Sequence, residues 1–358
     1  MNIEINNANK LPVPTWRWLK LNESTISCDK AGNFVQLKPQ ILNKTDDIQI
    51  TAQKKADFPE IITGIGDSAK EFAQNHAGLI NNFVIKANAT VNEPLVLTYK
   101  LSDDNFFVDD NYIYAEKNSK ATIILAYTSD YKAGGFHGSS VKIYAEENAQ
   151  IEVIQLQTLG KNYTNFDDIG GTCEKDAVIT TNQIELGSGK NWLGTNIELT
   201  CDKSQSHLNT NYLVSENQSL DVNYVVNIWG KKTDTTIISK GILMHNGEKT
   251  LRGTLDFKRG SKGSVGNESE EVLLLDPEIK NKSIPIILCG EEDIEGNHSA
   301  SIGEMDEAQL FYLRTRGLDD EQIRHMQIES KIQLICNELP KELHEYVLTY
   351  KQEAFKNE

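Results

Sequence analysis

Residues 80–290 consist of short apolar segments separated by polar turns. Segments such as NNFVIKANA, PLVLTYKL, ATIILAYT and QIEVIQLQ are rich in Val, Ile, Thr and Tyr, and many of them alternate apolar with polar positions. This alternation is typical of β-strands that place one face against a core. No long segment with a helical period interrupts the strands, so the pattern disfavours a fold of alternating strands and helices. The sequence therefore predicts a mainly β protein.

Two of these segments closely repeat each other. The segment IYAEKNSKATIIL begins at Ile113, IYAEENAQIEVIQ begins thirty residues later at Ile143, and a weaker echo, LVSENQSLDVNYV, begins at Leu213. A fixed period of this length indicates a solenoid. Repeats made only of strands favour a β-helix, whose coils stack at about 4.8 Å. An ordinary β-sandwich with a chance match is the alternative.

The two ends of the chain differ from this middle. We expect a mixed, partly helical region over residues 1–78, a parallel β-helix core over 79–303 and a helical region over 304–358. Near the start, two large aromatic side chains are expected to dock onto the core, namely Trp16 and Trp18. A short helix is expected within residues 66–78, with Asp67 or Ser68 as its N-cap and Gly78 after its end.

Three amphipathic helices are expected in the C-terminal region. Asp306 can cap the first, which stops at Gly317, a residue suited to the left-handed position after a helix. Asp319 and Gln322 form a capping box for the second helix, and Pro340 can open the third. The apolar residues expected on the buried faces are Ile323, Met326, Ile332, Ile335, Leu343, Val347 and Tyr350. Such helices either cap the solenoid or offer a surface to a partner.

The composition argues against several classes of function. The chain has 36 Lys and Arg against 52 Asp and Glu, a formal net charge of −16, which repels phosphate backbones and disfavours nucleic-acid binding. It contains no run of about 20 apolar residues, so no membrane span is expected. The first residues, MNIEINNANK, lack the basic and apolar regions of a signal peptide. We therefore expect a cytoplasmic protein.

The sequence contains no self-sufficient catalytic motif. The five cysteines form no CxxC pair, which favours free thiols, and a buried unreactive thiol is the plainer interpretation for each. There is no GxxxxGK[ST] phosphate loop, no HExxH and no GxSxG. The chain is therefore expected to be a non-enzymatic scaffold that depends on partners. A β-helix carbohydrate-active enzyme is a distant alternative, because such enzymes need clustered carboxylates on one face and are usually secreted.

A long pattern covers residues 241–276 and 289–322. Its features are a GxLxFxxGxxG run, a VLLLD segment, an HxAxxG turn and an LFYLRxRG helix. The pattern resembles the C-terminal core of the SufB/SufD family, the scaffold proteins of the Suf iron–sulfur cluster assembly machinery. The resemblance is strong over about residues 240–325 and weaker, though compatible, over the rest.

The resemblance implies a fold and a set of partners. The fold would be a right-handed parallel β-helix with helical regions at both ends. SufD-type chains pair with SufB-type chains through their β-helices, and each binds the ATPase SufC through its C-terminal helical region. An iron–sulfur cluster would form transiently at the interface, and whether flavin also binds stays open. The implied SufC-contact residues, on the first C-terminal helix, are Leu310, Phe311, Tyr312, Arg314 and Arg316.

Within the family, the sequence is more similar to SufD than to SufB. SufB-type chains have a cysteine two residues before the segment that matches VLLL, where this chain has Glu270. They also follow the matched histidine with a glutamate, whereas Ser299 follows His298 here. Some SufD chains have a cysteine two residues before that histidine, and this chain has Gly296 there. The resemblance therefore implies a SufD-like chain without a thiol in this turn.

His298 is the metal-binding residue that the resemblance implies, as a candidate iron or cluster ligand at the SufB interface. A neutral imidazole is a good ligand for iron and accepts a proton near neutral pH. The glycine and small polar neighbours of His298 would let a partner approach closely. The alternative is a histidine that only hydrogen-bonds across the interface.

The cysteines leave a second family reading open. Cys289, nine residues before the candidate histidine, is expected to be a buried thiol on a strand. A SufB-like homodimeric scaffold in a simplified system remains the alternative to a SufD-like subunit. Its thiols would then come from loops, through Cys173 or Cys201.

Overall fold

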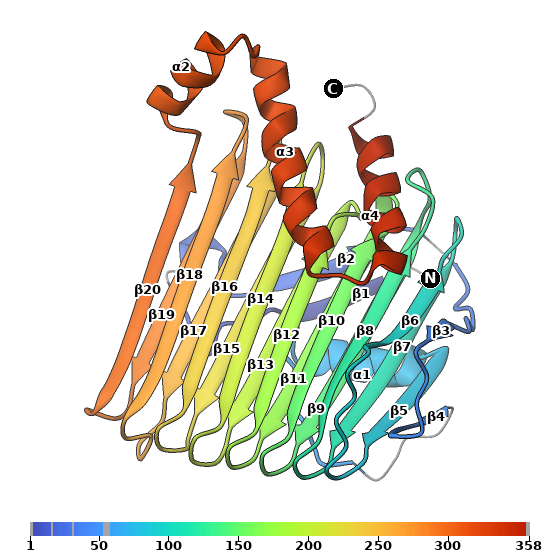
Figure 1. The fold of residues 1–358 in the computed structure, drawn as a ribbon, viewed down its shortest axis with the longest axis vertical. Coiled ribbons are helices and arrows are strands. Elements are labelled where there is room, and N and C mark those ends of the chain that lie inside the picture. The colour runs from blue at the N-terminus through green and yellow to red at the C-terminus, as the bar shows by residue number, and fades with distance from the viewer. Residues whose placement is uncertain (1–2, 16, 31, 53–57, 356–358) are drawn as a thin grey trace.

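The chain folds as a flattened parallel β-helix built of stacked coils (Figure 1). The computed structural model describes residues 3–15, 17–30, 32–52 and 58–355. The strands of successive coils form two nine-stranded sheets, which are parallel except where the first strand of each pairs antiparallel with the second. The prediction of a mainly β solenoid is confirmed, and the β-sandwich alternative is wrong.

One of these sheets is covered by C-terminal helices and is called the helix-covered sheet. In spatial order it contains β3 (Gln40–Leu42), β6 (Leu95–Lys100), β8 (Lys120–Thr128), β10 (Gln150–Thr158), β12 (Val178–Glu185), β14 (Gln205–Val214), β16 (Asp234–Leu243), β18 (Ser264–Leu274) and β20 (Ile294–Gly303). The second sheet contains β4 (Ile48–Ala52), β5 (Leu79–Ile85), β7 (Phe106–Ala115), β9 (Gly134–Ala145), β11 (Asn162–Cys173), β13 (Lys190–Leu199), β15 (Ser219–Ile228), β17 (Glu248–Phe257) and β19 (Lys280–Cys289).

The thirty-residue repeat corresponds to one coil. Ile113 on β7 pairs in register with Ile143 on β9. The weaker echo at Leu213 lies at the opposite edge, because it runs from β14 of the helix-covered sheet into β15 of the second sheet. What the three segments share is a turn asparagine with positive φ, at Asn118, Asn148 and Asn217. Asparagine tolerates this left-handed conformation better than most residues. The segment at Leu213 therefore shares the type of turn with the other two segments but occupies a different place in its coil.

The solenoid interior is mostly apolar but contains a hydrogen-bonded row of polar side chains. His137 Nδ1 lies 2.5 Å from Asn165 Oδ1, and Asn165 donates to Asp167 at 2.7 Å. Asp167 also accepts from Gln155 at 3.2 Å and hydrogen-bonds to Glu185. These five side chains are buried. Burial raises the pKa of Asp167 to about 7 and lowers the pKa of His137 to about 4, because loss of water disfavours the charged form of each group.

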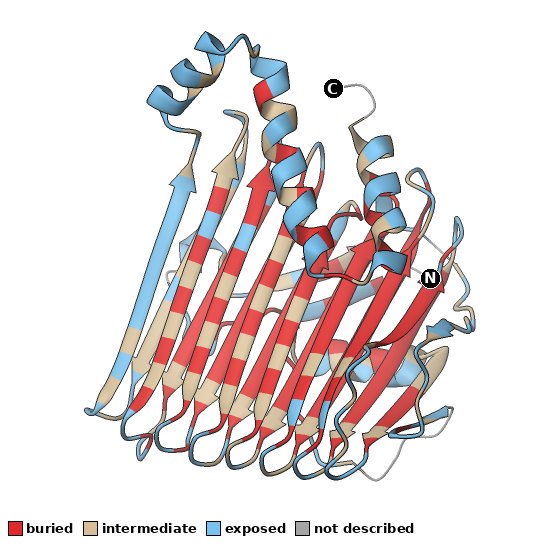
Figure 2. Ribbon diagram, in the orientation of Figure 1, coloured by how far each residue is buried: buried red, intermediate tan, exposed pale blue. Residues whose placement is uncertain are grey.

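Two C-terminal helices cover the apolar outer face of the helix-covered sheet (Figures 1 and 2). They are α3 (Asp320–Asn337) and α4 (Lys341–Ala354). Their buried apolar residues are Ile323, Ile328, Ile332, Ile335, Leu343, Val347 and Tyr350. The placement of Met326 on the buried face was wrong, because this side chain is 41% exposed and lines the groove beside α2 (Glu307–Thr315).

The signals for the helix ends are largely confirmed. Asp319 Oδ1 accepts from the Gln322 backbone at 2.8 Å, and the Gln322 side chain accepts from the Asp319 backbone at 3.0 Å, which completes the capping box. Gly317 has a φ of 90°, the left-handed conformation expected after α2. Asp306 occupies the N-cap position of α2 but makes no side-chain capping bond, and α4 begins directly after Pro340.

The N-terminal region packs on the outer face of the second sheet. It contains the antiparallel strands β1 (Ile3–Ala8) and β2 (Ser24–Cys28), the short 3₁₀ helix η1 (Arg17–Leu19), and α1 (Asp67–His76). Their apolar residues meet a row of phenylalanines from the sheet, Phe106, Phe136 and Phe166. The region is therefore richer in strands than the sequence indicated.

Two N-terminal details differ from the sequence expectation. Trp18 was expected to dock onto the core but is 75% exposed, because η1 buries none of its side chains and this segment meets the sheet through its backbone, at Leu21. Trp16 lies outside the described residues. The N-cap of α1 is Gly66, at a φ of 119°, and not Asp67 or the residue after it. None of the described helices is long and apolar enough to cross a membrane.

Candidate functional site at the open end of the solenoid

The last coil, β19 and β20, leaves the interior of the solenoid open. Each of its strands has a neighbour on one side only. On β18 every second side chain faces the interior and is buried, including Glu268 and Glu270. Their register partners on β20 are His298 and Ala300, which therefore face the same way. Because no further coil follows, this inner face is exposed along most of β20 (Figure 2).

His298 lies in the middle of β20 and is exposed. The expectation that it occupies a turn was wrong, because the GNHSAS stretch continues the strand ladder and pairs residue by residue with β18. The small neighbours of His298 still leave its ring accessible: Gly296 and Ala300 are the adjacent residues on the inner face. A partner that covers this end would therefore meet the imidazole directly.

Beneath the end coil lies a buried charged cluster. Lys249 on β17 forms an ion pair with Glu270 on β18, and its ammonium also donates to Ser283 on β19 at 3.4 Å. Glu268 lies opposite Gly253, where a Cβ would lie 2.1 Å from its Oε1 atom, so a larger residue at that position would displace the carboxylate. Burial lowers the pKa of Lys249, and it raises the pKa of Glu268 to about 7 against the opposing charge of Lys249.

Cys289 was expected to be buried and is exposed, because β19 is the last strand of its sheet. It does not share a ligand site with His298. Gly296 lies opposite Ile287 across the interior, so Cys289 lies near Ile294. His298 is four residues farther along that strand, which corresponds to about 13 Å.

Among the described residues, the remaining thiols and acids form no metal centre. Cys28, Cys173 and Cys336 are buried, and Cys201 is half-buried. Cys173 ends β11 inside the solenoid, where burial raises its pKa, so it is not the loop thiol that a homodimeric scaffold would need. In the part of the chain that the structure describes, no group of three or more His, Cys, Asp or Glu side chains could hold a metal ion.

The helix α2 follows the end coil after three residues and has no buried side chain. The residues expected to bind a partner lie on it, and Phe311 and Tyr312 are 70% and 54% exposed. Arg316 lies over the Tyr312 ring at 5.0 Å, and Arg314 donates to Asp320 at 2.8 Å. Leu310 is half-buried and faces the groove toward α3.

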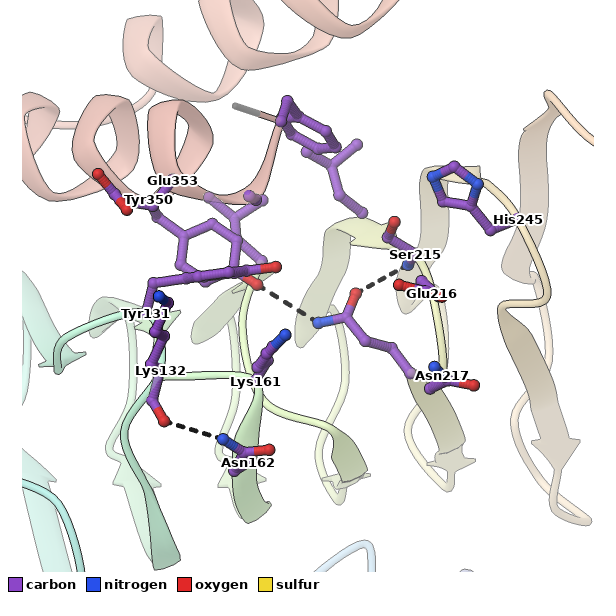
Figure 3. Close-up of a pocket in the computed structure, with 15 residues that line it drawn as sticks. Tyr131, Lys132, Lys161, Asn162, Ser215, Glu216, Asn217, His245, Tyr350 and Glu353 are labelled. Atoms are coloured by element: carbon purple, nitrogen blue, oxygen red, sulfur yellow. Dashed lines mark hydrogen bonds between the residues drawn. The ribbon is translucent and has the colours of Figure 1, made fainter. Parts of the chain in front are cut away.

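A separate cavity of about 630 Å³ lies between α4 and the turns of the solenoid (Figure 3). Gln218 contributes to its floor, where its amide donates to the Ser188 carbonyl and to the Tyr350 hydroxyl and accepts from the Ser215 backbone. The charged residues that line it are two lysines and two glutamates, Lys132, Lys161, Glu216 and Glu353. Since its charges balance and its buried amide is already bonded, we place the functional site at the open end.

Comparison with known families identifies the family of this chain. The family model for the SufBD core domain of the SUF system of FeS cluster assembly matches residues 98–331. This chain belongs to the SufBD family. The SufBD core match runs from β6 into α3, so it includes both the open end with His298 and the exposed α2.

Individual SufBD relatives have low sequence identity to this chain but align with most of its length. The chain is 23% identical to an iron–sulfur cluster assembly SufBD family protein of Mycobacterium leprae over 90% of its own length and 36% of the relative's. It is 26% identical to a SufBD family protein of Trieres chinensis over 80% of its own length and 63% of the relative's. It is 24% identical to one of Staphylococcus epidermidis over 72% of its own length and 56% of the relative's. The chain thus spans between about a third and two thirds of these relatives.

Sequence reasoning missed the charged cluster beneath the open end of this SufBD chain. Glu270 was noted only as the place of an absent cysteine, and Lys249 and Glu268 were not singled out. The available signal was the alternation of the strand: Glu268 and Glu270 are four and two residues before the apolar Val272 and so lie on the same strand face. That shared face places the carboxylates inside the solenoid, where a charge needs a partner.

Proposed function

We propose that this chain is a SufD-like scaffold subunit of a Suf iron–sulfur cluster assembly complex, located in the cytoplasm. It has no catalytic activity alone, pairs with a SufB-type chain and binds a SufC-type ATPase. Its membership of the SufBD family supports the assembly role. The observation that carries the proposal is the exposed inner face of the end coil, which presents His298 at a strand edge open for pairing.

The end coil suits pairing with a second β-helix. β19 and β20 are edge strands whose unpaired backbone groups can extend both sheets into a partner. His298 then lies at the junction of the two solenoids, where its imidazole is one ligand for a cluster that is cargo. The other ligands come from the partner, because no set of three suitable side chains occurs in the described part of this chain.

The helix α2 suits the docking of an ATPase. Its exposed Phe311 and Tyr312 offer aromatic anchors of the kind that dominate protein interfaces. Only three residues separate α2 from β20, and His298 lies nine residues before the helix begins. A displacement of α2 during ATP hydrolysis is therefore transmitted to the edge strand that bears the histidine.

The charged cluster favours the SufD-like role over the SufB-like one. Where SufB-type chains carry a thiol, Glu270 is buried in an ion pair with Lys249. One observation favours the homodimeric alternative: Cys289 is exposed on the same end coil and could serve as a thiol there. Pairing two copies through this end would bring two such thiols into one interface.

Co-expression separates these roles. Tagged SufC is expressed with this chain, with and without SufB, and the purified complexes are weighed by native mass spectrometry. One copy of this chain with one SufB and two SufC supports the SufD-like role. Two copies of this chain with SufC support the homodimer. Absence of SufC binding removes the main support for either.

The role of His298 is tested in the assembled complex. His298→Ala should leave assembly intact and reduce cluster formation, measured by iron and sulfide content and by visible absorbance. Asn297→Ala is the matched control, because Asn297 is exposed on the outward face of the same strand. Normal cluster yield in the His298→Ala complex would remove this residue from the mechanism.

A further inference from the structure

His298 and Glu268 are register partners on adjacent parallel strands, β20 and β18. Side chains paired in this way point to the same face and stack about 4.8 Å apart. His298 is exposed at the open end, whereas Glu268 is only 6% exposed in the layer beneath. The imidazole therefore lies between this buried carboxylate and whatever covers the end.

Glu268 has an unused acceptor. Its Oε2 atom is buried and accepts no hydrogen bond from the described residues. A buried acceptor without a donor is destabilising, and such atoms are uncommon in folded proteins. The ammonium of Lys249 is already directed to Glu270 and Ser283. His298 is the register partner of Glu268 on the next strand, so its imidazole is a donor stacked about 4.8 Å along the solenoid from this carboxylate.

We propose that Glu268 positions His298 by accepting a hydrogen bond from its Nδ1–H group. The two ring nitrogens lie on opposite sides of the ring axis, so an Nδ1 that faces the layer beneath directs Nε2 out of the open end. The bond also fixes the tautomer, because an Nδ1 that carries the proton leaves Nε2 unprotonated with its lone pair free. A carboxylate beneath a histidine is a common way to orient a ligand nitrogen and raise its basicity.

This inference rests on the proposed function only in one respect, the role of the free Nε2 atom as a cluster ligand. The contact itself belongs to this chain and forms without cluster or partner. Glu268 is a positioning residue here, since it acts through His298. Its role can therefore be examined on the isolated protein, separately from any assembly assay.

The test is the tautomer of His298, read from long-range ¹H–¹⁵N correlation spectra of the ¹⁵N-histidine-labelled chain at pH 8.5. The chain has seven histidines, and the His298 signals are identified by their loss in His298→Gln. The expected pattern is a protonated Nδ1 and an unprotonated Nε2. Glu268→Leu should abolish that pattern and give the Nε2–H form that predominates in water.

Two further variants keep the test decisive. Glu268→Gln retains an acceptor oxygen in the same shape and should preserve the wild-type pattern, even if the leucine variant folds poorly. Glu271→Gln removes an exposed carboxylate on the outward face of the same strand and should change nothing. A wild-type spectrum with the proton on Nε2, or a pattern that survives in a folded Glu268→Leu chain, would overturn the proposal. Failure of His298→Ala to affect cluster yield would count against the proposed function and leave this contact standing.

Discussion

Lys249 on β17 and Glu270 on β18 form an ion pair across the solenoid interior, in the coil next to the open end. Both side chains are almost completely buried. Breaking such a pair strands a charge in the protein interior, whereas replacing both partners by apolar groups does not.

We therefore expect Lys249→Met to reduce the free energy of unfolding by about 3–5 kcal/mol. The double variant Lys249→Met, Glu270→Leu should recover most of that loss. Urea denaturation followed by circular dichroism measures both. Lys240→Met is the matched control, because Lys240 pairs at 3.6 Å with Glu271 on the exposed outer face and should cost less than about 1 kcal/mol. Equal losses in the two single variants would contradict the argument.

The buried carboxyl groups predict a stability that falls as pH rises. Burial raises the pKa of Asp167 to about 7 and that of Asp109 to about 6, above their values in the unfolded chain. A raised folded pKa means that the folded protein holds the proton more tightly. Its contribution is complete below about pH 4 and is lost as pH rises toward 7. His137, whose pKa burial lowers to about 4, opposes this trend. Asp168 and Glu268, whose pKa values burial raises to about 6 and about 7, add to it.

Asp167→Asn should flatten this dependence by up to about 1 kcal/mol per pH unit between pH 5 and 7. The measurement is the free energy of unfolding in urea at half-unit pH intervals. Asp130→Asn, at an exposed turn position, should leave the slope unchanged. A slope for Asp167→Asn equal to that of the wild type would show that Asp167 is ionised in the fold.

Because α2 is exposed, we expect a substitution on it to weaken the binding of SufC without lowering the stability of the fold. Since Phe311 is 70% exposed and α2 buries no side chain, Phe311→Ala should change the free energy of unfolding by less than about 0.5 kcal/mol. The same change should weaken binding of SufC at least tenfold in titration calorimetry, about 1.4 kcal/mol. Leu348→Ala, on the exposed face of α4, should affect neither quantity. Unaltered affinity in Phe311→Ala would move the docking site away from α2.

The cap of α1 predicts a strict need for glycine at Gly66. A Cβ there would have ample space, since the nearest atom is 3.8 Å away, but the φ of 119° is one that other residues rarely adopt. Gly66→Ala should therefore cost about 1–3 kcal/mol through backbone strain. A Cβ at Gly303 would likewise meet no neighbour, and the φ of Gly303 is not positive. Gly303→Ala should therefore change the stability of the protein little. Thermal unfolding of the two variants compares them directly.

Local chemistry in the sequence determined the elements and their order. Alternating strands and the capping box at Asp319 depend on residues a few positions apart, and the repeat of Ile113 at Ile143 can be read along the chain; all were confirmed. The motifs within residues 241–322 indicated the SufBD family, to which the chain belongs. The role of His298 and the partners remain predictions.

Tertiary structure alone decided what is exposed. Alternation gives the face of a strand but not whether another coil covers it, so Cys289 was placed inside although its strand is the last in its sheet. For the same reason, the pairing of Lys249 with Glu270 and the placement of His298 over Glu268 depend on which strands stack in register. Those contacts join residues that are 21 and 30 positions apart, and only the closing of each coil brings them together.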